Sequence, residues 1–247
     1  MRDTRLIMGM PITVEIIDDA PFRHMEDVYD FFISIDNRFS PYKSASELSE
    51  YNRGDVATAG LSAEMLEVLA LADRTRIETN GYFDLKRPDG LLDPSGIVKG
   101  WAVRKAARMI QAFGVQNFYV DAGGDIQTGG KNGNGEDWIV GIRNPFGEHE
   151  IIKAVLVREC GIATSGTYVR GQHIYNPHLP KKQIDDIVSL TIIGPDVLEA
   201  DRFATAAFAM GEEGIYFIEE LRGFEGYIVN SSGVATQTSG FGELVVS

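Results

Sequence analysis

The order of the expected helices and strands limits the possible folds more than any other feature of the sequence. Apolar residues at spacings of three and four predict a helix over residues 22–39, and Ser62 and Gly81 suit the two caps of the next helix. Helices cluster early and late with strands between them, without regular βαβ alternation, so we expect an α+β fold rather than a doubly wound sheet. The expected helices are 22–39, 62–80, 95–113, 199–211 and 214–221, and the expected strands are 12–17, 118–120, 138–142, 151–157, 187–193 and 227–229.

The composition is that of an ordinary globular chain with an acidic surface. The 247 residues are 44% hydrophobic and 24% charged, and we expect them to form a single domain over residues 1–247. The 36 acids and 23 bases give a formal net charge of −13, which argues against nucleic acid or an anionic membrane as a partner. A nucleotide is still compatible with this charge, because a divalent cation and backbone N–H groups can hold phosphate on an acidic protein.

The sequence predicts a chain without a membrane span. Residues 1–6 lack the apolar core and cleavage site of a signal peptide, and no apolar run approaches the roughly 20 residues that cross a bilayer. We therefore expect a cytoplasmic location, although a form trimmed of an export signal would have the same sequence. The single cysteine, Cys160, has no partner for an internal disulfide and is expected to be a buried structural thiol.

The helix expected at residues 199–211 carries one acid and one hydroxyl among small and apolar residues. Asp201 and Thr205 are four positions apart and therefore lie on the same helix face. A carboxylate and a hydroxyl one turn apart are suitable oxygen ligands for Mg²⁺. The alternative is that Asp201 only occupies the first helical turn, where the helix dipole stabilises an acid.

Residues 93–103 combine glycines with a lysine at the start of another helix. Gly96 and Gly100 would let the backbone approach a ligand, and the helix N-terminus would receive an anion, with Lys99 adding a positive charge near a phosphate. The alternative is a helix start in which small residues only permit close packing.

Other polar segments support more than one interpretation. Residues 81–84 (Gly-Tyr-Phe-Asp) place two aromatic residues next to an acid. The aromatics could stack on a planar ligand ring, or they could be packing residues next to an acid that caps the helix. The glycines of 121–125 are interpreted as turn residues, 163–168 as a phosphate site or a turn, and 129–135 as a hairpin connection. His173 is the best candidate for a general base, because an unperturbed pKa near 6.5 suits that role; a structural loop histidine is the alternative.

Taken in order, these segments resemble the ApbE family, the FAD:protein FMN transferases. The matching segments extend over nearly the whole chain: 8–10, 39–52, 81–84, 93–103, 123–125, 138–142, 163–168, 173–174 and 200–205. The resemblance implies an α+β fold related to the tunnelling fold, with mixed or antiparallel sheets and packed helices. It also implies a Mg²⁺-dependent reaction that splits FAD, attaches FMN by a phosphoester bond to a Thr or Ser of a target protein, and releases AMP.

The resemblance also assigns roles to individual residues. Asp201 and Thr205 correspond to metal ligands, with the Gly96 carbonyl completing the site, and His173 corresponds to the group that deprotonates the acceptor hydroxyl, with Asp201 beside it in the catalytic set. The residues that correspond to FAD contacts are Met8, Tyr42, Tyr82, Phe83, Asp84, Asp93, Lys99 and Ile174.

Two segments depart from the family pattern. Residues 85–88 (Leu-Lys-Arg-Pro) replace a Thr-Val-Gly-Pro-like run, and residues 175–179 (Tyr-Asn-Pro-His-Leu) replace Asp-Pro-x-Thr-Gly, so that Asn176 stands where the family has an acid beside the base. We expect these departures to affect transfer more than the binding of FAD and Mg²⁺. Two alternatives therefore remain open, an FAD pyrophosphatase that yields FMN and AMP, and a flavin-binding protein without transfer activity.

Overall fold

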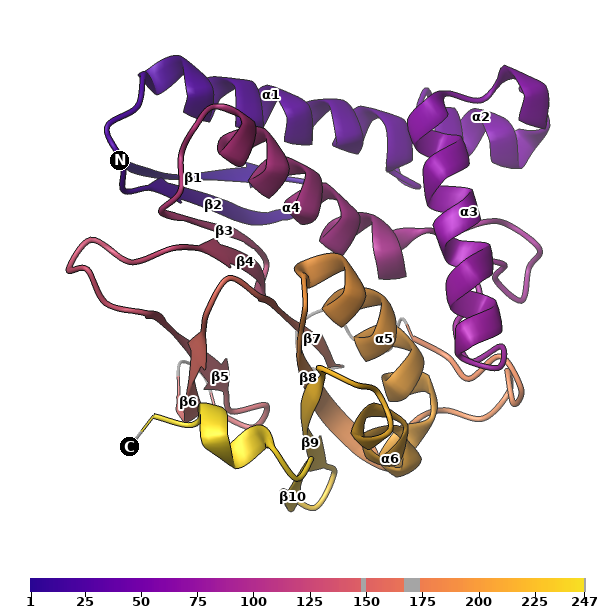
Figure 1. Cartoon of the computed structure of the whole chain (residues 1–247). Coiled ribbons are helices and arrows are strands. Elements are labelled where there is room, and N and C mark those ends of the chain that lie inside the picture. Colours follow the sequence, from indigo (N-terminus) through magenta and orange to yellow (C-terminus); the bar gives the residue numbers. More distant parts are fainter. Residues whose placement is uncertain (148–149, 167–173, 247) are drawn as a thin grey trace.

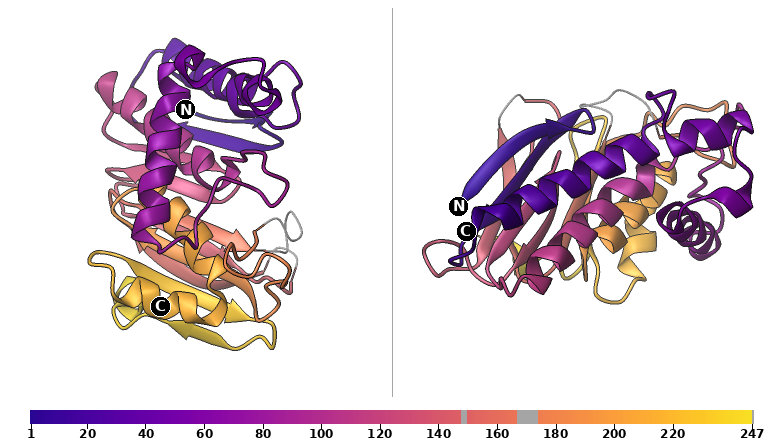
Figure 2. Two further views of the ribbon diagram at one scale, coloured as in Figure 1. Left: turned by 90° about the vertical axis from the view of Figure 1, so that its right-hand side faces the viewer. Right: turned by 90° about the horizontal axis from the view of Figure 1, so that it is seen from above.

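The fold places a layer of helices on one face of a long antiparallel sheet. The computed structural model describes residues 1–147, 150–166 and 174–246. The sheet has eight strands in the order β1-β2-β3-β4-β7-β8-β9-β10, and every pairing in it is antiparallel. Helices α1, α4 and α5 lie side by side across this sheet (Figure 1, Figure 2). The expected α+β class is confirmed.

The strands agree with the expected ones where β-branched residues are frequent. The expected strands 151–157 and 187–193 appear as β6 and β8, and 138–142 appears as β5. Strands β1, β4, β7 and β10 were not predicted from the sequence. Their bounds are β1 Arg2–Ile7, β2 Met10–Ile16, β3 Phe118–Ala122, β4 Asp125–Gly129, β5 Trp138–Arg143, β6 Ile151–Val157, β7 Gly161–Gly166, β8 Ile187–Gly194, β9 Glu225–Asn230 and β10 Ala235–Gln237.

The helices follow the apolar periodicity closely. Helix α1 spans Phe22–Phe39 as predicted, and the apolar residues at spacings of three and four that predicted it are buried: Met25, Tyr29, Phe32, Ile35 and Phe39. Helix α3 begins after Ser62, whose hydroxyl accepts from the Met65 N–H at 3.2 Å, but it ends at Glu78 rather than 80, because Asn80 adopts a positive φ of 51°. The remaining helices are α2 Glu47–Arg53, α4 Ser95–Ala112, α5 Val197–Ala209 and α6 Gly214–Glu219.

The glycine-rich segment 129–135 is not the hairpin connection expected from its composition. It leads from β4, which pairs with β3 and β7, to β5, which pairs with β6 in a separate two-stranded sheet. This pair lies below β4 in Figure 1. The hairpin prediction was wrong because turn residues specify a change of direction without specifying which strands then pair.

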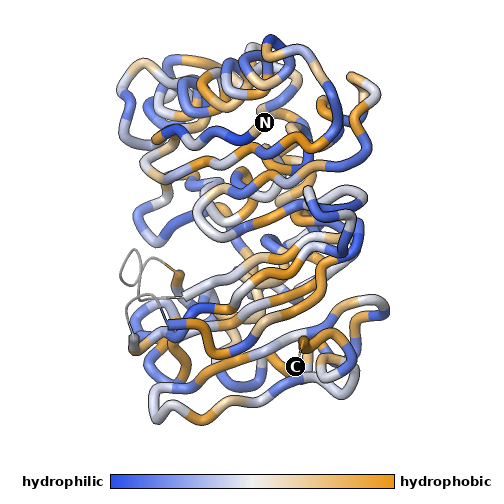
Figure 3. The backbone as a smooth tube through the Cα atoms, turned by 90° about the vertical axis from the view of Figure 1, so that its left-hand side faces the viewer, coloured by the Kyte–Doolittle hydropathy of each residue, from blue (hydrophilic) through white to orange (hydrophobic). Residues whose placement is uncertain are grey.

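Apolar packing occurs on both faces of the sheet, and Figure 3 shows apolar stretches along the stacked strands. One cluster fills the space between strands β1–β3 and helices α1, α3 and α4, and a second lies between α5, α6 and strands β8 and β9. A third cluster, which includes Val140, Val155 and Phe241, packs the β5–β6 pair against the opposite face of the sheet.

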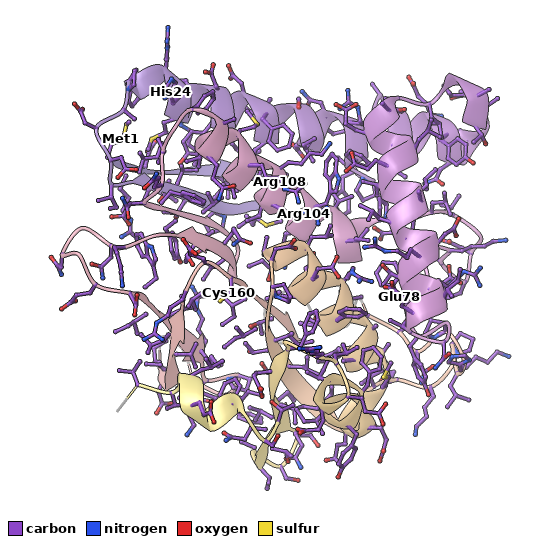
Figure 4. The ribbon with its side chains drawn as sticks, in the orientation of Figure 1. Met1, His24, Glu78, Arg104, Arg108 and Cys160 are labelled. Atoms are coloured by element: carbon purple, nitrogen blue, oxygen red, sulfur yellow. The ribbon has the colours of Figure 1, made fainter. Side chains whose placement is uncertain are left out.

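Ion pairs join the helices that carry the site. Arg104 of α4 contacts Asp196, the N-cap of α5, at 3.2 Å, and the buried Arg202 of α5 pairs with Glu78 of α3. Figure 4 shows Arg104 and Glu78 on their helices, on the side toward α5. These contacts fix α5 against both neighbours. No helix within the described residues combines the length and apolar character needed to cross a membrane.

Candidate functional site

A cavity of about 930 Å³ lies where the start of α4, the middle of α5 and strands β3, β4, β5 and β7 meet. This volume is near the upper end of the range for small-molecule sites, roughly 300–1,000 Å³. Of the predicted site residues that the structure describes, all except Met8 line the cavity: Tyr42, Tyr82, Phe83, Asp84, Asp93, Gly96, Lys99, Ile174, Asp201 and Thr205.

The floor of the cavity is the part formed by Gly96 of α4 and by Asp201 and Thr205 of α5. It depends on a close approach of these two helices. A Cβ added at Gly100 would lie 2.6 Å from the Asp201 Cβ and 2.8 Å from the Val197 carbonyl oxygen. At Gly96 it would lie 2.9 Å from Cγ2 of Thr205. Both glycines are therefore required by packing, as one interpretation of the sequence proposed, and this packing also brings the backbone of α4 to Asp201 and Thr205.

Three oxygen-bearing groups meet at the floor from these two helices. The Thr205 hydroxyl donates to the Gly96 carbonyl oxygen at 3.1 Å, and the Gly100 N–H donates to Oδ2 of Asp201 at 2.8 Å. Asp201 lies in the second turn of α5, since Asp196 is the N-cap, so the first-turn interpretation of this acid is wrong. Its side chain is instead buried at 3% exposure and borders the cavity.

A second buried acid, Asp125 of β4, stands beside Asp201. Its Oδ2 atom lies 2.7 Å from the Lys99 Nζ atom, and its other oxygen accepts the Thr164 N–H at 3.2 Å. Burial, followed by the neighbouring Asp125 carboxylate, raises the pKa of Asp201 well above its usual value. Gly123 and Gly124 have positive φ in the turn between β3 and β4, as predicted, but Asp125 was not predicted as a site residue. The signals in the sequence were an acid directly after two glycines and its place in the segment 123–125 that resembles the family.

The floor has the donor set of a magnesium site. Its candidate ligands, the Gly96 carbonyl, the Thr205 hydroxyl and the Asp201 carboxylate, are all oxygens, which Mg²⁺ prefers, and in the described part of the chain Lys99 is the single lysine beside two buried carboxylates. A divalent cation would neutralise this excess negative charge and stabilise the ionised form of Asp201, whose pKa is raised by burial and by the Asp125 carboxylate. Within the ranges 1–147, 150–166 and 174–246, no three His, Cys, Asp or Glu side chains form a metal cluster, so a site here needs the Gly96 carbonyl and the Thr205 hydroxyl.

The residues that depart from the family pattern touch one another at the cavity wall. The Tyr175 hydroxyl donates to the Lys86 carbonyl oxygen at 2.7 Å, and His178 packs edge-on against Tyr82, with ring centroids 4.5 Å apart. The Asn176 side chain accepts the His178 N–H at 2.9 Å and so stabilises its own turn. The segments 85–88 and 175–179 are therefore in contact, and this contact holds Tyr82, which lines the cavity, against residues 175–178.

Two predicted site residues are not placed at the cavity. Met8 has a positive φ of 56° and packs against the apolar cluster under α1, while its neighbours Gly9 and Met10 line the cavity instead. His173 lies outside the described residues, as do 167 and 168 of the hydroxyl-rich segment 163–168. The described part of that segment belongs to β7, where Thr164 and Ser165 border the cavity.

Comparison with known proteins gives a consistent result. A model of the ApbE family matches residues 8–87 and 85–228 of the chain. The FAD:protein FMN transferase of Escherichia coli K12 is 29% identical over 64% of this chain and 47% of its own length, so the chain spans about half of that relative. The FAD:protein FMN transferase of Haemophilus influenzae is 24% identical over 94% of this chain and 87% of its own.

The fold matches solved structures over its full extent. The flavin transferase ApbE from Vibrio cholerae superposes with a TM-score of 0.85 at 22% identity, covering 99% of this chain and 98% of that one.

Proposed function

The chain belongs to the ApbE family, and we propose that it is a Mg²⁺-dependent flavin transferase that attaches FMN from FAD to a Thr or Ser hydroxyl of a partner protein and releases AMP. The observation that carries this proposal is the meeting of the Gly96 carbonyl, the Thr205 hydroxyl and the Asp201 carboxylate at the floor of a cavity of about 930 Å³.

The cavity has separate regions for the two chemical parts of FAD. The flavin ring would lie along the wall that contains Tyr82 and Ile174, since aromatic and aliphatic side chains bind planar rings. The pyrophosphate would lie over the start of α4, where Ser95 and Gly96 border the cavity at the positive end of an 18-residue helix. Lys99, held by Asp125, adds a positive charge to this region.

The metal would be held by Asp201, Thr205 and the Gly96 carbonyl oxygen. A bound Mg²⁺ ion would neutralise the negative charge that develops on the pyrophosphate. The chain itself holds one Asp201 oxygen in place through the Gly100 N–H, and the ion pair between Asp125 and Lys99 keeps the lysine at the floor.

The transfer exchanges one phosphorus–oxygen bond for another. The acceptor oxygen forms a bond to the phosphorus of the FMN half, the bridging bond to the AMP half breaks, and AMP leaves with the electron pair. The acceptor hydroxyl loses its proton to His173, a role that rests on the family resemblance alone.

The proposed function is tested by incubating the protein with FAD, Mg²⁺ and a candidate acceptor. We expect AMP release together with a covalently flavinylated acceptor. Asp201→Asn and Thr205→Val should abolish both, whereas Thr205→Ser, which keeps the hydroxyl, should retain them. AMP and free FMN in the absence of an acceptor would indicate an FAD pyrophosphatase, and FAD that binds and stays intact would indicate a binding protein.

A further inference from the structure

The outer edge of strand β5 borders the same cavity as the floor. Every residue from Ile139 to Arg143 lines the cavity. Successive side chains of a strand point to opposite faces, and Val140 and Ile142 are buried in the cluster beneath the sheet. A strand that lines a cavity with consecutive residues therefore presents its edge, with the main-chain polar groups, to that cavity.

The register shows which main-chain groups are exposed at this edge. The Val246 N–H donates to the Ala154 carbonyl oxygen at 2.9 Å, so the polar groups of Ala154 point away from β5. Gly141 lies opposite Ala154 in the antiparallel pair, so its N–H and C=O point away from β6 in turn. Ile139, two residues earlier, points its main-chain groups the same way. Among the described residues, β5 pairs only with β6, which leaves this edge without a partner strand.

The surface beside this edge is apolar. Ile139 and Ile151 are 54% and 52% exposed, and the Ile151 side chain lies over Gly141, where an added Cβ would come within 2.8 Å of its Cδ1 atom. An unpaired strand edge next to exposed aliphatic side chains is suited to an extended polypeptide, which gains main-chain hydrogen bonds from the edge and side-chain contacts from the aliphatic residues.

We propose that the edge of β5 binds the acceptor protein as an added extended strand, paired with the main chain of Ile139 and Gly141. The inference rests on the proposed function, which requires a protein hydroxyl in the same cavity as the Asp201 and Thr205 floor. Successive side chains of an extended segment point to opposite sides. One Thr or Ser can therefore reach the phosphate while the side chains before and after it pack on Ile139 and Ile151. Because the edge recognises main-chain atoms, a short unstructured segment of the acceptor is sufficient for binding.

The first test uses a library of short Thr-containing peptides with wild-type protein, FAD and Mg²⁺. We expect flavinylation of some peptides. If a folded acceptor protein is flavinylated but none of the peptides is, strand addition is overturned while the proposed function stands. If neither is flavinylated, the proposed function itself fails.

The second test uses the best peptide and the variant Ile139→Pro, which removes an outward N–H without removing a bond of the β5–β6 ladder. We expect the KM for the peptide to rise about tenfold, the effect of losing roughly 1.4 kcal/mol of hydrogen bonding. Ile139→Ala, which keeps the N–H, should change it less. The dissociation constant of FAD should not change. An equal rise in the peptide KM and in the FAD dissociation constant would show that the edge binds FAD, which would overturn the proposal.

A measurement on the wild-type protein does not depend on the folding of a variant. Peptide binding to the FAD-loaded, Mg²⁺-free protein should slow amide hydrogen exchange at Gly141 and Ile139 at least tenfold. Unchanged exchange at both amides with bound peptide would overturn the proposal.

Discussion

The buried carboxylate of Asp125 and the partly exposed ammonium group of Lys99 form an ion pair, with 2.7 Å between Oδ2 and Nζ, at the floor of the cavity. Lys99 is thereby held where a phosphate would bind, and Asp125 adds a negative charge next to Asp201. The ion pair connects β4 and α4, and the contact of Asp125 with Asp201 adds α5, which lies about 70 residues later in the sequence.

Replacing Asp125 by Asn should impair turnover more than binding of the flavin ring. The amide keeps an acceptor for the Thr164 N–H but releases Lys99 and removes one of the two charges that attract a cation. We expect AMP release to fall about 10- to 100-fold, the usual effect of losing a supporting group around a metal site. The control is Asp55→Asn, which breaks only an exposed ion pair with Arg53 and should release AMP at the wild-type rate.

Gly100→Ala should destabilise the protein and damage the proposed metal site together. The new methyl group would meet the Asp201 Cβ atom at 2.6 Å, which forces α4 and α5 apart. Such overpacking costs about 1–3 kcal/mol of unfolding free energy, which urea denaturation measures. Gly133→Ala is the matched control, because its nearest neighbour is the Ile17 Cδ1 atom at 3.9 Å. Equal stability of the two variants would contradict the close helix contact.

Arg202→Met should loosen α5 from α3 without changing the cavity floor. The buried guanidinium donates to Glu199 at 2.9 Å and pairs with Glu78, which is partly exposed and regains water once the arginine is lost. We expect a loss of about 2 kcal/mol in unfolding free energy, within the range for hydrogen bonds to charged groups. Arg158→Met, in an exposed ion pair with Asp137, should leave the urea midpoint unchanged.

Tyr175→Phe tests the contact between the two segments that depart from the family pattern. The change removes only the hydroxyl that donates to the Lys86 carbonyl oxygen. The dissociation constant of FAD, measured by flavin fluorescence, should rise about 2- to 10-fold, as expected for one net hydrogen bond. The exposed Tyr216→Phe serves as control, and an unchanged affinity in Tyr175→Phe would show that this contact does not shape the cavity.

The sequence predicted the parts of the fold whose local pattern is strong. Helix α1 and strand β6 have the expected bounds because apolar spacing in one and β-branched residues in the other are decisive on their own. Strands β4 and β7 were missed, since both are short and contain Gly and Thr, and both are held by neighbours on both sides rather than by their own propensity.

The candidate site shows the same division. Asp201 and Thr205 were identified because both lie on one helix, where the spacing of four residues already places them together. Asp125 was missed because its contact with Asp201 exists only after β4 packs under α4 and α5. For Gly100 the sequence left two interpretations open, approach to a ligand and close helix packing. Its contact with α5 shows the packing, a distinction that requires the packed helices.

The most direct measurement is the mass of a candidate acceptor protein co-expressed with this chain. We expect the acceptor to gain one FMN on a Thr or Ser beside the wild-type chain, and none beside Asp201→Asn. The acceptor is chosen as one that a flavin transferase modifies. If it stays unmodified beside the wild-type chain, the proposed function is contradicted. Equal modification beside Asp201→Asn would remove Asp201 from the site.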